Sequence, residues 1–131
     1  VTYGDNNRTQ MIRTAGPGHF EDRTVSAGCN PYLILAAYVA AGMDGVANKV
    51  DPGEPNMENM YDRPLAEVLA TGTGILPQSL AEAVEELERD DVVQAALGPI
   101  ADEFIALKTQ EWDEYGSQVS SWEIDKYLTF F

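Results

Sequence analysis

Residues 7–23 read Asn-Arg-Thr-Gln-Met-Ile-Arg-Thr-Ala-Gly-Pro-Gly-His-Phe-Glu-Asp-Arg, and this stretch decides the fold of the first part of the chain. Residues 9–14 have the weak alternation of a short strand, and residues 19–25 predict a second strand. Between them, two glycines and a proline within four residues interrupt any regular element. The stretch therefore predicts a β-hairpin with its turn at residues 15–18.

Charged side chains gather along this hairpin. Because side chains alternate along a strand, His19, Glu21 and Arg23 are expected on one face. Arg8 and Arg13 lie close by in the sequence, and arginine binds phosphate or carboxylate through its forked donors. A carboxylate beside a phosphate site commonly holds a divalent cation. The alternative is a simple ion pair between Glu21 and Arg23 on an exposed strand. The spacing of the residues alone favours this ion pair over a metal and phosphate site.

The residues from 30 onward predict a mainly helical part. Asn30 suits the N-cap of a helix and Pro31 its first position. Residues 32–46 are apolar nearly all round, which predicts a helix buried on most sides. Ser-x-x-Glu capping boxes mark two later helix starts, at Ser79 and Ser120. The further helices are expected at residues 64–70, 77–89, 90–97, 99–115 and from 120 onward.

The fold class is therefore α+β: a short antiparallel strand pair at residues 1–29, followed by a mainly helical part at residues 30–131. The length of 131 residues suits one domain. Two strands cannot bury a face by themselves, and the chain opens at Val1 rather than Met. We therefore expect a portion of a longer polypeptide whose sheet has more strands.

The composition excludes several functions. Asp and Glu number 22 against 8 Lys and Arg, which gives a net charge of −14 and argues against partners such as nucleic acid or an anionic membrane. No apolar run approaches the ~20 residues of a membrane span. The single cysteine, Cys29, predicts a reducing compartment, and we expect the cytoplasm.

Four other features allow a functional and a structural interpretation. His19, the only histidine, follows a turn, so a surface position is favoured over a catalytic one. Cys29 precedes a helix without an evident base, which favours a small buried residue over a nucleophile. Residues 71–74, Thr-Gly-Thr-Gly, lack the Lys-Ser/Thr of a phosphate loop. Tyr61 is interpreted as a loop tyrosine that packs on the preceding helix.

Several ordered motifs together resemble the glutamine synthetase family, over nearly the whole chain and at matching separations. They are Asn7-Arg8-Thr9-Gln10-Met11-Ile12-Arg13, Phe20-Glu21-Asp22-Arg23, Asn30-Pro31-Tyr32-Leu33 with Ala41-Gly42-Met43-Asp44-Gly45-Val46, Asn48-Lys49-Val50-Asp51-Pro52-Gly53-Glu54, and Tyr61-Asp62-Arg63-Pro64. The resemblance implies the C-terminal portion of a glutamine synthetase catalytic domain. It also implies an ATP-dependent ligase that joins glutamate to ammonia or a small amine through γ-glutamyl phosphate, with Mg²⁺ or Mn²⁺.

The same resemblance implies roles for individual residues. Arg8 and Arg23 correspond to catalytic arginines, Arg8 at the transferring phosphoryl group and Arg23 at the glutamate end. The other implied roles are substrate binding for Asn7 and Arg23, nucleotide binding for Arg13 and His19, and metal binding for Glu21. Tyr61 corresponds to a tyrosine that some bacterial members adenylylate, and an unmodified tyrosine is favoured in the divergent branch.

The sequence departs from the usual pattern of the family in two places. The hairpin turn is short, and His19 stands where the family usually has arginine, which leaves the nucleotide affinity and its pH dependence open. The short turn and the form Phe20-Glu21-Asp22-Arg23 resemble the branch that includes γ-glutamylmethylamide synthetase, which leaves the amine open.

The resemblance also implies an oligomer of stacked rings, with the apolar residues 122–131 reaching the opposing ring. The alternative function is a non-catalytic fragment with only an assembly role. The retained Arg8, Arg13, Glu21 and Arg23 favour the enzyme, although the portion by itself is not expected to be active.

Overall fold

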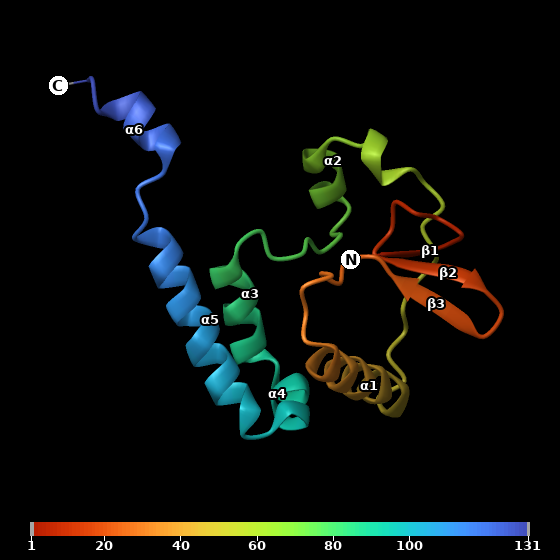
Figure 1. Ribbon diagram of the computed structural model, residues 1–131. Coiled ribbons are helices and arrows are strands. Elements are labelled where there is room, and N and C mark those ends of the chain that lie inside the picture. Colours follow the sequence, from red (N-terminus) through yellow and green to blue (C-terminus); the bar gives the residue numbers. More distant parts are fainter. Residues whose placement is uncertain (1, 131) are drawn as a thin grey trace. The chain divides into compact units, whose positions relative to one another are not determined.

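The computed structural model describes residues 2–130, which divide into two compact units, the first ending at Leu76 and the second beginning at Pro77 (Figure 1). The elements of the first unit are β1 Tyr3–Asp5, β2 Ile12–Gly16, β3 His19–Asp22, α1 Pro31–Ala47, the 3-10 helix η1 Met60–Asp62 and α2 Leu65–Ala70. Those of the second unit are α3 Leu80–Arg89, α4 Asp91–Leu97, α5 Ile100–Gly116 and α6 Ser121–Tyr127.

The predicted hairpin is confirmed, with shifted bounds. β2 and β3 pair antiparallel, and Arg13 lies opposite Glu21. β2 continues to Gly16, so the turn narrows to Pro17 and Gly18. Gly18 has a φ of 79°, a conformation that glycine adopts without the steric penalty of a side chain.

The hairpin has a third strand beside it. β1 pairs parallel with β2, so the strand order is β1-β2-β3. Residues 9–11, expected to begin the strand predicted at residues 9–14, instead form turns and bends between β1 and β2. The Asn7 side chain accepts a hydrogen bond from the backbone N–H of Thr9 at 3.0 Å. Such local side-chain bonds compete with a strand ladder, which explains the late start of β2.

The helix α1 begins as predicted, but its predicted burial is wrong. The Asn30 side chain accepts from the backbone N–H of Tyr32, and Pro31 occupies the first position. No residue of α1 is buried, and Tyr32 and Val46 are 82% and 71% exposed. The exposed stripe consists of Tyr32, Leu35, Val39, Met43 and Val46, so no element of the first unit covers this apolar face.

The second unit is helical, as predicted. Its core contains Val84 of α3, Leu97 of α4 and Ala101 of α5. The capping box of α6 is complete, because Ser120 and Glu123 exchange hydrogen bonds. At α3 the Ser79 hydroxyl caps Glu82, whose own carboxylate accepts from the backbone of Gln78. Within residues 2–130, no helix has the length and apolar character to cross a membrane.

Candidate functional site

The hairpin of β2 and β3, with Arg23 directly after β3, carries a cluster of opposite charges. Arg13 Nη1 lies 2.8 Å from Glu21 Oε2, and Arg23 Nη1 lies 3.6 Å from Glu21 Oε1. The cross-strand pairing places Arg13 opposite Glu21, and alternation along the chain returns Arg23 to the same face. The shared face predicted for Glu21 and Arg23 is thus confirmed.

Arg8 belongs electrostatically to the same cluster. The hydrogen bond from Arg13 lowers the pKa of Glu21, and the positive charges of Arg13, Arg23 and Arg8 lower it further. Within the described residues 2–130, Arg8 forms no ion pair, so its guanidinium is available for a bound anion. The cluster therefore combines an ionised carboxylate with cationic donors, which suits a phosphate and its accompanying cation.

Asn6 is a residue of this cluster that the sequence did not reveal. Its Oδ1 accepts from Arg13 Nε at 3.0 Å and from Nη2 at 2.6 Å, so it holds one edge of the guanidinium while Glu21 holds another. Asn6 has a φ of 49°, in the left-handed region that asparagine tolerates better than most residues. The Asn-Asn pair before Arg8 was the available signal, because asparagine favours such turns.

The opposite face of β3 is tied to α1. Tyr38 of α1 donates a hydrogen bond from its hydroxyl to Asp22, whose side chain also accepts from the backbone and hydroxyl of Thr24. Burial by itself would raise the pKa of Asp22, but these hydrogen bonds lower it below its usual value. The bonds to Thr24 also explain why β3 ends at Asp22 rather than at residue 25.

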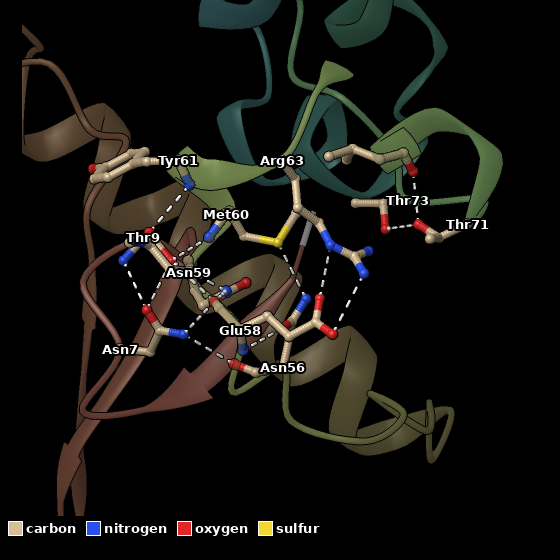
Figure 2. Close-up of polar contacts among 12 residues, drawn as sticks. Asn7, Thr9, Asn56, Glu58, Asn59, Met60, Tyr61, Arg63, Thr71 and Thr73 are labelled. Carbon is tan, nitrogen blue, oxygen red and sulfur yellow. Dashed lines mark hydrogen bonds and ion pairs between the residues drawn. The ribbon is translucent and has the colours of Figure 1, made fainter. Parts of the chain in front are cut away.

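Two other sequence candidates lie in different surroundings. His19 is exposed at the start of β3, beside the hairpin turn, in agreement with a surface position. Asn7 lies in the turn before β2, where its amide contacts the backbone of the segment around Glu58 (Figure 2).

A cavity of about 310 Å³ adjoins Arg8 and Arg23. Met60 and Tyr61 of η1 also line this cavity, together with Thr73 of the loop after α2. These segments lie about 40 residues or more beyond the hairpin in sequence, and no local pattern connects them with it. Their approach to the two arginines is a feature that sequence reasoning missed.

The remaining candidates are assigned as follows. Tyr61 lies in η1 and is 77% exposed, so its ring is not packed away on a helix. Cys29 is half-buried rather than buried.

The structure does not cluster three or more His, Cys, Asp or Glu side chains as a metal site within residues 2–130. Glu21 fits a divalent cation as one carboxylate ligand among others, because its side chain is 44% exposed and remains ionised.

The comparisons with known proteins agree with this arrangement. The family described as glutamine synthetase, catalytic domain, matches residues 1–127. The glutamate–methylamine ligase of Methyloversatilis universalis is 51% identical over 131 residues, 100% of this chain and 29% of that protein. A glutamine synthetase of Archaeoglobus fulgidus is 42% identical over 135 residues, 98% of this chain and 28% of that protein.

Solved structures show the same similarity. A complex of GmaS with ADP superposes with a TM-score of 0.88 and 40% identity over 97% of this chain and 29% of that chain. GmaS without ligand gives a TM-score of 0.89 at 40% identity over 98% of this chain and 30% of that chain. The chain thus spans about 30% of the length of these relatives. It belongs to the glutamine synthetase family, within the catalytic domain.

Proposed function

We propose that this chain is the C-terminal portion of the catalytic domain of an ATP-dependent ligase that joins glutamate to ammonia or a small amine. The observation that carries the proposal is the convergence of Arg8, Arg13 and Arg23 on the ionised Glu21. The similarity to glutamate–methylamine ligase makes methylamine a sharper candidate than ammonia for the amine.

The proposed reaction passes through γ-glutamyl phosphate. Phosphoryl transfer depends mainly on positioning and on neutralising charge at the phosphoryl oxygens. In this proposal Arg8 stabilises the transferring phosphoryl group, Arg13 binds the nucleotide phosphates and Arg23 holds the glutamate end. Attack of the amine on the acyl phosphate then releases phosphate and forms the γ-glutamyl amide.

Glu21 would hold the divalent cation, Mg²⁺ or Mn²⁺, as one of several ligands. A bound cation supplies charge neutralisation between the nucleotide phosphates. Arg13 and Arg23 keep Glu21 ionised and hold its carboxylate in place. The complete enzyme is proposed to be cytoplasmic and to assemble as stacked rings, and Tyr61 is its candidate for adenylylation.

An assay of the complete enzyme tests this proposal. Glutamate, ATP and Mg²⁺ are supplied with either ammonium or methylamine, and the γ-glutamyl product is identified by mass. We expect the amide to form together with ADP and phosphate, faster with methylamine at equal concentration. The absence of any γ-glutamyl product with either amine would contradict the proposal and favour the assembly-only alternative.

A further inference from the structure

The turn that carries Arg8 is joined to a distant segment through one backbone carbonyl. The carbonyl oxygen of Glu58 accepts from Asn7 Nδ2 at 2.9 Å and from Gln10 Nε2 at 3.1 Å. Figure 2 shows Asn7 and Thr9 directed at this segment, which lies about 50 residues further along the chain. We call the side chains of Asn7, Thr9 and Gln10, with the backbone of residues 56–60, the Glu58 clamp.

The amide of Asn7 is fully used within this clamp. Its Nδ2 donates to the carbonyls of Asn56 and Glu58 at 3.2 and 2.9 Å. Its Oδ1 accepts from the backbone N–H and the hydroxyl of Thr9 at 3.0 and 2.8 Å. An asparagine side chain has two donor hydrogens and two acceptor lone pairs, so all four are occupied. No hydrogen-bonding capacity is left for a substrate.

Thr9 and Gln10 strengthen the same contact. The Thr9 hydroxyl accepts from the backbone N–H of Met60 at 3.0 Å, and its single hydrogen is shared between Asn7 Oδ1 at 2.8 Å and the more distant Glu58 carbonyl at 3.3 Å. Gln10 is 3% exposed, so loss of its partners would leave buried polar groups unsatisfied. The turn and residues 56–60 therefore hold their conformations together.

Arg8 lies between two members of the clamp. It is in a turn without strand pairing, and its guanidinium forms no ion pair among residues 2–130. The direction of its side chain therefore depends on the backbone that Asn7 and Thr9 hold. Met60 and Tyr61, just beyond Glu58, line the cavity that Arg8 also lines.

We propose that Asn7 is a positioning residue whose contact with the Glu58 carbonyl fixes Arg8 for phosphoryl transfer. This inference rests on the proposed function. It replaces direct substrate binding by Asn7, the role that the family resemblance implies, with an action through Arg8.

The test compares Asn7→Ala and Asn7→Asp in the complete enzyme. Asn7→Asp keeps the acceptors for Thr9 but replaces the donors to Asn56 and Glu58 with a carboxylate that repels both carbonyls. We expect both variants to lower kcat about tenfold, as loss of one or two hydrogen bonds to an aligned group predicts. The KM for glutamate should stay within about twofold. Asn48→Ala is the matched control, because the Asn48 side chain donates to Asp44 at the end of α1 and takes no part in the clamp.

Hydrogen exchange provides a readout independent of turnover. Peptides covering residues 56–60 should exchange faster in both Asn7 variants than in the wild type or in Asn48→Ala. Unchanged exchange of residues 56–60 in the Asn7 variants would show that Asn7 does not hold this segment. Faster exchange together with an unchanged kcat would show that Asn7 holds the segment but does not position Arg8. A raised KM for glutamate with kcat preserved would show that Asn7 binds substrate directly. A complete enzyme without ligase activity would contradict the proposed function alone, because exchange still tests the clamp.

Discussion

Glu21 lies between Arg13 and Arg23, and each arginine contacts a different carboxylate oxygen. If the proposed metal role is correct, Glu21→Gln removes a charged ligand from a hard cation while keeping the shape of the side chain. We expect a requirement for more Mg²⁺ or Mn²⁺ and an activity at least about tenfold lower. Activity is measured against metal concentration, with Glu85→Gln on the exposed face of α3 as control. Identical metal activation in wild type and Glu21→Gln would contradict the role.

Arg8 forms no close ion pair among residues 2–130 and contributes to the Glu21 cluster only by its charge, which suits a group whose partner arrives with the substrate. We expect Arg8→Ala to lower kcat more than it raises the KM for ATP, because the proposed contact is with charge that develops during transfer. Steady-state kinetics of the complete enzyme measure both constants. Arg89→Ala is the matched control, since Arg89 forms ion pairs with Glu85 and Glu86 on the exposed face of α3. A change confined to KM would show that Arg8 only binds nucleotide.

His19 is exposed at the hairpin turn, two residues before Glu21 in the same strand. Neutral histidine is a weaker phosphate ligand than arginine, which is always charged and offers forked donors. We therefore expect His19→Arg to tighten ADP binding at pH 7, measured by calorimetry on the complete enzyme. Equal affinities for wild type and variant from pH 6 to pH 8 would place His19 away from the nucleotide.

At the scale of elements, β3 is held from both sides. Its one face carries the Glu21 cluster, and its other face is tied to α1 through Asp22 and Tyr38. Burial and the hydrogen bond to Asp22 raise the pKa of Tyr38, whereas hydrogen bonds lower the pKa of Asp22. The bonded form of the pair is therefore stable over a wide pH range.

The Tyr38–Asp22 bond predicts a defined pH dependence of stability. Tyr38→Phe should lower the free energy of unfolding by about 1–2 kcal/mol at pH 7. Because the folded pKa of Tyr38 is raised, its contribution is complete below about pH 10 and is lost as pH rises through the folded value. Because the folded pKa of Asp22 is lowered, the contribution of Asp22 to the free energy of unfolding is present above about pH 4. It is lost as pH falls through the folded pKa of Asp22.

Urea unfolding of wild type and Tyr38→Phe from pH 3 to pH 11 measures this difference. The difference in free energy of unfolding between the two proteins should be constant between pH 5 and pH 9, and it should become smaller below pH 5 and above pH 9. Tyr115→Phe, an exposed tyrosine of α5, is the control. Equal stability of wild type and Tyr38→Phe at pH 7 would show that the bond contributes nothing.

At the scale of the whole molecule, the end of the chain presents an apolar surface. Trp122, Leu128 and Phe130 are 60%, 75% and 75% exposed. Large exposed aromatic side chains are typical of residues that anchor interfaces. If the complete enzyme assembles as the proposed stacked rings, deletion from Trp122 onward should leave each ring intact and separate or weaken the ring pair.

Light scattering of the truncated enzyme measures the particle mass, which should fall toward that of one ring. Ser120→Ala is the control: it weakens the cap of α6 by about 1 kcal/mol but keeps the apolar side chains. An unchanged particle mass after the deletion would show that α6 packs within its own subunit.

The sequence alone determined the local structure of this protein. The hairpin turn at Pro17 and Gly18, the cap at Asn30 and the capping box at Ser120 depend on residues within a few positions of one another. Alternation along β3 likewise placed Glu21 and Arg23 on one face. These features could be predicted because backbone sterics and local hydrogen bonds act over a few residues.

Only the tertiary structure decided the rest. The pairing of β1 with β2, the exposed stripe of α1 and the contact of Asn7 with Glu58 have no local signature in the sequence. The last joins residues 51 positions apart through a backbone carbonyl, which every residue possesses. Such an acceptor is specified by its position in the fold rather than by its side chain, so the surroundings of Arg8 became visible only in three dimensions.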